Sequence, residues 1–175
     1  MMNNFLLKRK IKKLIKNSER ERAYLSLREI KSVMVLFDTE DFEDANFFIK
    51  HLKKLGKRIK VFAYKNSNDV NNYSRISYTP VVKKNMKYLR SESLNQINSL
   101  LSEKFDLVVD LTLKENLLLL YVLVAANSPL KIGIYKHTPQ VHDIVISSFS
   151  HGPEQNIKEL GEQLIYYLTT ISSNT

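Results

Sequence analysis

Cysteine and tryptophan are absent from this 175-residue sequence, and glycine and proline each occur only four times. Without cysteine the chain has no disulfide, no thiol nucleophile, no iron–sulfur cluster and no cysteine-containing zinc site. The glycines are too widely spaced for a G-x-G-x-x-G turn or a Walker A loop: Gly56, Gly133, Gly152 and Gly161. The common dinucleotide and nucleoside-triphosphate fingerprints are therefore excluded.

Long hydrophobic runs are also missing. The longest begins with Leu117 and ends with Ala126, which is about half the roughly 20 residues that a bilayer-spanning helix needs. A secretory signal has basic residues before its apolar stretch, whereas here a short apolar triplet, Phe5-Leu6-Leu7, precedes the basic residues. We therefore expect a cytoplasmic protein. The length and the 43% hydrophobic content predict a single folded domain.

Positive charge is concentrated at the N-terminus. The first 30 residues hold nine basic and three acidic side chains, so they carry +6 of the net charge of +9. Residues 4–17 have the 3.6-residue period of an amphipathic helix, whose apolar face carries Leu7, Ile11, Leu14 and Ile15. The sequence predicts a basic helical extension over residues 1–30 and an α/β domain over residues 31–175.

The basic face of this helix has three interpretations, and four side chains define it: Arg9, Lys12, Lys13 and Lys16. The helix docks its apolar face on the domain, or it contacts an anionic membrane surface, or it contacts the phosphates of a nucleic acid. Because the helix lacks the aromatic belt of strong interfacial binders, docking is favoured and the two surface contacts are the alternatives.

Strands alternate with helices in the rest of the chain. Short apolar runs at residues 32–37, 58–64, 107–111, 132–135 and 143–147 are typical of buried parallel strands. The helix between the first two ends at Gly56, a predicted left-handed cap. Further helices are predicted from Ser91 or Ser93, from a capping box that starts at Thr112, and from Pro153. This pattern predicts a single Rossmann-like, mostly parallel sheet with helices on both faces.

Two regions give weaker patterns. Ser18 and Glu21 have the spacing of a capping box, which indicates a second short helical piece after the first. Residues 65–90 are rich in asparagine, with a possible short strand at residues 76–78 that Pro80 is expected to interrupt.

Polar side chains follow several predicted strands. In an open parallel sheet, ligands bind beyond the carboxyl ends of the strands, near the point where the strand order reverses. The candidate crevice residues are Asp38, Thr39, Asp110, Thr112, Lys136 and His137. Together they would suit a sugar or a phosphorylated small molecule. Helix capping by Asp38 or Thr39 and by Thr112 explains these residues without a ligand, and we favour that structural interpretation.

Metal and nucleophilic chemistry have no support. The acidic residues near the start of the first domain helix spread around the helix axis, so their oxygens do not converge on one point. The four histidines form no H-x-x-x-H or H-E-x-x-H pattern, although His137 and His142 flank one loop and could meet. No G-x-S-x-G elbow is present. We expect no metal, no cofactor and no identified catalytic residue.

The helix that contains Leu117 and Ala126 is apolar on all sides. Such a helix must be covered on more than one side, by another helix of the chain or by a second subunit. A homodimer through this helix is therefore one of the predictions.

Several segments carry a family resemblance: residues 31–64, FDLVVDLT at 105–112, LLLLYVLVAANSPLKIGIY at 117–135, HDIVIS at 142–147 and EQLIYYLTTI at 162–171. Together they resemble an uncharacterised bacterial family of short Rossmann-like proteins. FDLVVDLT, the apolar helix and KIGIY are also distantly similar to the acceptor-binding half of glycosyltransferase family nine, the heptosyltransferases. Where those enzymes have a glycine-rich turn after the first strand, this sequence has Asp38-Thr39-Glu40.

These observations lead to two main hypotheses about function. The first is a non-catalytic binding or interaction module that resembles half of a two-domain glycosyltransferase. The alternative is an enzyme that acts on a sugar-like or phosphorylated small molecule in the crevice, with Asp38, Asp110 and His137 at its centre. Peripheral membrane or nucleic-acid contact through the basic helix is a weaker alternative.

Overall fold

The computed structural model describes residues 4–65, 78–82, 91–134, 141–147 and 157–171, and every structural statement below concerns these residues. The helices are α1 (Asn4–Lys16), a short 3-10 helix η1 (Thr39–Asp41), α2 (Phe42–Lys54), α3 (Ser91–Leu101), α4 (Leu117–Ala125) and α5 (Ile157–Thr170). The strands are β1 (Ser32–Asp38), β2 (Arg58–Lys65), β3 (Tyr78–Val82), β4 (Leu107–Asp110), β5 (Leu130–Ile134) and β6 (Ile144–Ile146).

The described strands form one six-stranded sheet in the order β3-β2-β1-β4-β5-β6, and every pair is parallel. This order is that of the doubly wound Rossmann fold. The chain first builds outward from β1 to β3 and then returns to β4 on the other side of β1. The predicted Rossmann-like α/β fold is therefore confirmed.

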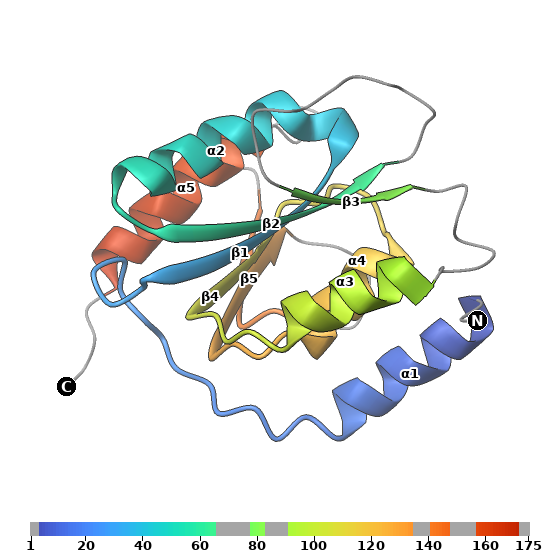
Figure 1. Ribbon diagram of the computed structural model, residues 1–175. Helices are drawn as coiled ribbons and strands as arrows, with labels where there is room; N and C mark the ends of the chain where they lie inside the picture. Colours follow the sequence, from blue (N-terminus) through green and yellow to red (C-terminus); the bar gives the residue numbers. More distant parts are fainter. Residues whose placement is uncertain (1–3, 66–77, 83–90, 135–140, 148–156, 172–175) are drawn as a thin grey trace.

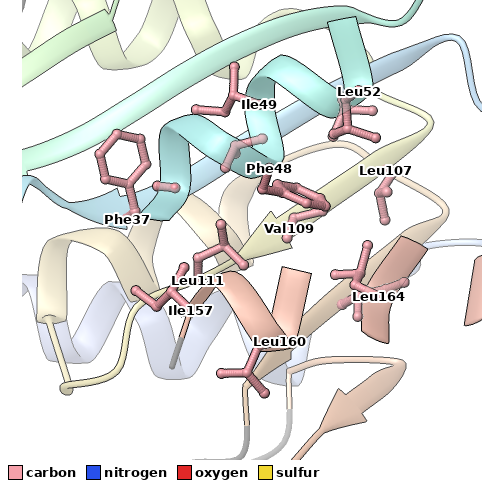
Figure 2. Close-up of a cluster of buried hydrophobic side chains, with 14 of the residues drawn as sticks. Phe37, Phe48, Ile49, Leu52, Leu107, Val109, Leu111, Ile157, Leu160 and Leu164 are labelled. Atoms are coloured by element: carbon pink, nitrogen blue, oxygen red, sulfur yellow. The ribbon is translucent and has the colours of Figure 1, made fainter. Parts of the chain in front are cut away.

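Helices cover both faces of the sheet (Figure 1). α2 and α5 lie on one face, while α3 and α4 lie on the other with α1 outside them. The alternation of side chains in β1 separates two cores, since Val35 and Phe37 pack toward α2 and α5 whereas Met34 and Leu36 pack toward α4. Figure 2 shows the first core, in which Phe48 of α2 and Leu164 of α5 meet residues of the sheet.

The apolar helix α4 is enclosed within the chain. Each of its side chains is buried or half-buried. α1 runs beside α4 and adds Leu7 and Ile11 to the same core, and the ammonium of Lys10 lies 5.0 Å from the ring centroid of Tyr121. α1 thus covers a face that the sequence left in need of a partner, as the favoured docking interpretation requires.

Local signals differ in how well they predicted the structure. Gly56 has a φ of 72° after α2, as a left-handed cap requires. The helix predicted from Ser18 is wrong, because residues 18–26 form neither helix nor strand. Pro80 lies inside β3 and does not interrupt it. β3 is an edge strand, and an edge position tolerates a residue that has no backbone N–H to donate.

The helix start predicted at Thr112 is also wrong. α4 begins at Leu117, and its N-cap is Asn116, whose side-chain oxygen accepts hydrogen bonds from the backbone N–H groups of Leu118 and Leu119 at 3.1 and 3.2 Å. Asparagine is one of the most favoured residues at a helix N-cap. Thr112 is therefore free of the capping role and lies in the loop between β4 and α4. The predicted helix start at Pro153 lies outside the described residues.

Candidate functional site

A cavity of about 600 Å³ lies on the α4 side of the sheet, where β4 and β5 end. β4 is next to β1, at the point where the strand order reverses, so the cavity is where doubly wound folds place their ligands. α1 and α4 together contribute half of its lining residues. The described residues that line it are Phe5, Lys8, Arg9, Ile11, Lys12, Ile15, Asp110, Thr112, Glu115, Asn116, Leu117, Leu120, Ile134, Val141, His142 and Val145.

A buried acid–imidazole pair forms the polar part of this pocket. Asp110 is the last residue of β4, and its Oδ2 lies 3.2 Å from Nε2 of His142. Their side chains are only 5% and 9% exposed. The backbone N–H and the hydroxyl of Thr112 both donate to Oδ1 of Asp110, at 3.0 and 2.5 Å. With both oxygens engaged, the carboxylate is fixed in one orientation and holds the imidazole in place.

The imidazole reaches Asp110 because β5 has a glycine at the crossing point. Gly133 pairs with Asp110 on one side and with Val145 on the other. A Cβ atom on Gly133 would overlap the ring of His142. The side chain of His142 therefore occupies the space that any other residue would fill, which is a common reason for glycine inside a strand.

The N-terminal helix supplies the cationic wall. Lys8, Arg9 and Lys12 of α1 line the pocket opposite the strand ends. Within the described residues none of the three has a carboxylate partner. The lining also holds the carboxylates of Asp110 and Glu115, so three cations face two anions. This excess of positive charge favours an anionic group in the cavity.

The sequence-predicted crevice residues separate into three groups. Asp110 and Thr112 line the pocket, while Asp38 and Thr39 lie at the end of the neighbouring strand β1 and are not among its lining residues. Burial raises the pKa of Tyr64, and the charge of Asp38 raises it further, which places this carboxylate beside β2. Lys136 and His137 lie outside the described residues.

Capping does not account for the residues at the strand ends. Asp38 is the N-cap of η1 and Asp41 that of α2, and neither makes a side-chain capping hydrogen bond. Thr112 donates to Asp110 instead of capping α4. The four predicted basic contacts are all exposed, and two of them, Arg9 and Lys12, also line the pocket, whereas Lys13 and Lys16 do not.

His142 is the site residue that the sequence did not single out. It precedes β6, so its position in the chain predicts the amino end of a strand, away from the carboxyl ends where ligands bind. Gly133, a glycine in the middle of an apolar strand, was the available signal, since it marks a place where another group approaches the backbone.

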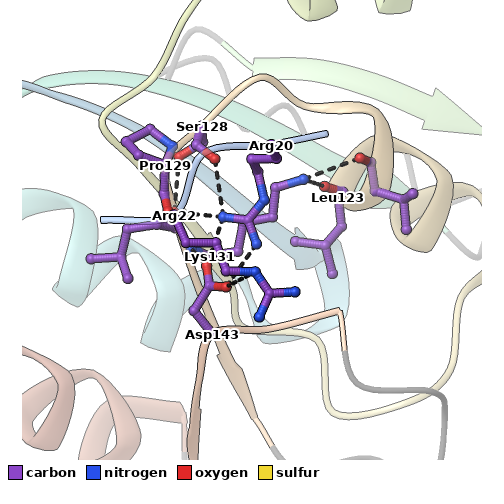
Figure 3. A network of polar contacts seen from close by, with 9 residues as sticks. Arg20, Arg22, Leu123, Ser128, Pro129, Lys131 and Asp143 are labelled. Carbon is purple, nitrogen blue, oxygen red and sulfur yellow. Dashed lines mark hydrogen bonds and ion pairs between the residues drawn. The ribbon is translucent and has the colours of Figure 1, made fainter. Parts of the chain in front are cut away.

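A second polar cluster lies next to the pocket, and none of its described residues lines that pocket. Figure 3 shows it around Asp143, whose oxygens accept two hydrogen bonds from the guanidinium of Arg20, at 2.7 and 2.8 Å. Arg20 also donates to the carbonyls of Ser128 and Pro129. Burial alone would raise the pKa of Asp143, but these bonds, the Lys131 amide and the charges of Arg20 and Arg22 lower it.

Lys131 of β5 completes this cluster. Its ammonium donates to the carbonyls of Leu123 and Val124 at the end of α4, at 2.6 and 3.1 Å, and so satisfies acceptors that the helix leaves open. Burial and the charge of Arg20 lower the pKa of Lys131 to about 7, although Asp143 acts in the opposite direction. Every charged group here has a protein partner, so the cluster stabilises the fold.

Among the described residues there is no group of three or more histidine, aspartate or glutamate side chains that could hold a metal ion. The described helices include none with the length and apolar character needed to cross a bilayer.

The strand order and the position of the pocket define a Rossmann-like α/β protein with a strand-end cavity. The model of a family of unknown function, DUF6913, matches residues 3–171, and the chain belongs to this family. Neither the search of curated proteins nor that of solved structures found a match. The uncharacterised family expected from the sequence is thus confirmed, while the comparisons show no similarity to glycosyltransferases.

Proposed function

We propose that this protein is a non-catalytic binding module whose pocket, between α1, α4 and the ends of β4 and β5, takes one small organic molecule. The observation that carries the proposal is the cavity itself. Its volume of about 600 Å³ lies within the range of about 300 to 1,000 Å³ of small-molecule sites. A fixed polar pair and a mostly apolar lining are the usual composition of such sites.

Blocking the cavity tests the proposal. Leu120 of α4 lines it, so Leu120→Trp should fill part of the space. Leu55→Trp is the matched control, because Leu55 follows α2 and lines a separate cavity of about 610 Å³ on the other side of the sheet. A ligand of that second cavity would lose binding in Leu55→Trp and keep it in Leu120→Trp. A panel of metabolites is screened by thermal shift, and binding is then measured by calorimetry. A ligand present at about 100 times its Kd stabilises a protein by roughly 2.7 kcal/mol.

The proposal predicts that ligands found with the unmodified chain also bind Leu55→Trp and no longer bind Leu120→Trp. Ile15→Trp fills the pocket from the opposite wall, on α1, and should cause the same loss of ligand binding. It provides the test if Leu120→Trp does not fold. Circular dichroism establishes that each variant is folded. If folded Leu120→Trp and Ile15→Trp bind every hit as tightly as the unmodified chain, the pocket is not the binding site.

Catalysis at the same place is the second candidate, and the pair of Asp110 and His142 favours it. An imidazole oriented by a carboxylate is a common general acid or base. The test is incubation with nucleotide-sugars and sugar phosphates, with product followed by phosphorus NMR. Turnover that His142→Gln and Asp110→Asn abolish supports an enzyme. Binding that persists in the unmodified chain without turnover supports the non-catalytic module.

Three sequence predictions stay open beside this proposal. The likeness to the acceptor-binding half of a glycosyltransferase rests on FDLVVDLT and the residues after it, and stabilisation by nucleotide-sugars is its test. A homodimer through α4 would require a second copy to replace or supplement α1, and light scattering measures it. Contact of the basic helix with membranes or nucleic acid predicts that deletion of residues 1–17 removes binding to vesicles or oligonucleotides.

A further inference from the structure

Resting on the binding role proposed above, we propose a class for the ligand: a single-chain amphipathic anion. Its apolar part lies along α4 and the ends of β5 and β6, and its anionic head meets Arg9 and Lys12 of α1. Three features of the pocket favour this class: its apolar lining, its cationic wall and the exposed residue at the start of α1.

Apolar side chains from several elements line the cavity. Leu117 and Leu120 of α4, Ile134 of β5 and Val145 of β6 line the cavity, and Ile11 and Ile15 of α1 join them. A polyhydroxylated ligand would lose its hydrogen bonds to water against this surface and gain few in return. An apolar chain instead gains roughly 25 cal/mol for each Å² that leaves water.

Charge within the pocket favours an anion. Lys8, Arg9 and Lys12 bring three cations, whereas the carboxylates of the lining are Asp110 and Glu115. The hydrogen bonds of Asp110 go to Thr112 and His142, and among the described residues no ion pair joins Asp110 to a cation of α1. A carboxylate or phosphate head would supply the counter-charge that Arg9 and Lys12 lack among the described residues.

The start of α1 gives an apolar ligand a place to approach. Phe5 lines the cavity and yet is 72% exposed. A large aromatic side chain at a cavity wall buries more of its surface when an apolar chain lies against it. α1 is also the wall that carries the cations, so one helix presents both the charge and the apolar contact that an amphipathic anion needs.

Calorimetry on the full chain with four soluble probes of equal chain length tests this class. The probes are octyl phosphate, octanoate, octanol and octylammonium. The two anions are expected to bind about tenfold or more tightly than octanol, and octylammonium to bind more weakly still, because a charge-assisted contact adds about the 1.4 kcal/mol that a factor of ten requires.

Charge variants locate the head group. The double variant Arg9→Gln/Lys12→Gln should weaken octyl phosphate about tenfold and leave octanol unchanged. Lys50→Gln/Lys53→Gln removes the same charge from exposed positions of α2, on the other face of the sheet, and should change neither affinity. Equal weakening by both double variants would indicate general attraction by the net charge and would overturn the assignment of the head group.

The outcomes separate this inference from the binding role on which it rests. If octanol and octylammonium bind as tightly as the anions and Leu120→Trp abolishes all of them, the pocket binds but the anionic class is wrong. If no probe binds and no screen hit depends on Leu120, both proposals fail. Retention on phosphatidylglycerol vesicles that needs Arg9 and Lys12, with no binding of free octyl phosphate, overturns the pocket ligand in favour of surface contact by α1.

Discussion

His142 and Asp143 are consecutive residues that belong to two polar clusters with opposite properties. The side chain of Asp143 is 2% exposed and is held by Arg20 and the Lys131 amide, and Asp143 is not among the residues that line the pocket. His142 pairs with Asp110 on the wall of a cavity. The charges of these two clusters therefore have different roles, although His142 and Asp143 are adjacent in the sequence. Around Asp143, each charged group has a protein partner, and the charges stabilise the fold. Beside Asp110 and His142 there is a cavity, and the polar groups of this pair are available to a ligand.

The cluster around Asp143 also positions the pair of Asp110 and His142. Arg20 lies just beyond the end of α1, and its guanidinium joins the start of β5 to the residue before β6. The carbonyl of Pro129 additionally accepts from the backbone N–H of Ala23. These bonds fix the segment that follows α1, and so they hold the cationic wall of the pocket at its distance from α4.

Removing Arg20 should produce the largest effect. In Arg20→Ala the buried carboxylate of Asp143 loses its two-pronged partner, and we expect a loss of about 3 kcal/mol in the free energy of unfolding, measured with urea. Arg22→Ala is the control, because Arg22 is 69% exposed and 3.4 Å from the same carboxylate, and it should cost less than about 1 kcal/mol. Equal losses would remove the distinction between the two arginines.

A side chain at Gly133 should disturb the pair of Asp110 and His142. Gly133→Ala places a Cβ where the ring of His142 lies, and overpacking of this kind costs about 2 kcal/mol. In a His142→Ala background the same change should cost less than about 1 kcal/mol, because the overlapping ring is gone. Urea unfolding of the four proteins gives the coupling energy. A coupling near zero would contradict the placement of His142 over β5.

Lys131 should make stability depend on pH above neutrality. Because its pKa falls to about 7 in the folded chain from 10.5, the unfolded chain binds more protons between these values, and stability rises with pH across that window. We expect a gain of about 1 to 2 kcal/mol between roughly pH 7.5 and 9. Lys131→Met should flatten this rise. An unchanged slope in Lys131→Met would assign the pH dependence to another group.

The smallest effect concerns the start of α4. Asn116→Ala removes the side-chain oxygen that caps two backbone N–H groups, and it should cost about 1 kcal/mol in thermal or urea unfolding. Asn98→Ala makes the same change at an exposed position within α3, where alanine favours the helix, and should cost nothing. A larger loss at Asn98 would be inconsistent with Asn116 as the cap.

The fold was predictable because its signals are local and repeated. The apolar run of β1, the helix that ends at Gly56 and the run of β2 each agree with one βαβ unit, and the structure confirms all three. Competing local signals were the ones that failed. Neither of the two capping-box patterns, at Ser18 and at Thr112, starts a helix. The pattern at Thr112 spans four residues and cannot show that Asn116, just after it, is the better N-cap.

The site was predictable only in part. Asp110 and Thr112 follow a buried strand, and the rule for open parallel sheets placed them at the cavity. Arg9 and Lys12 were identified from their charge, but their place on the pocket wall depends on how α1 docks, which no local pattern encodes. The contact between His142 and Asp110 was not predicted, because it crosses β5 through the space left by Gly133.

The docking of α1 has a consequence for how the protein is made. Arg20 contacts Ser128, 108 positions further along the chain, and α1 packs against α4, which begins at Leu117. Contacts between such distant parts of a sequence form late in folding. During translation α1 therefore has no α4 to pack against until the residues from Leu117 onward have been synthesised. The cavity between α1 and α4 therefore cannot form before α4 has been synthesised.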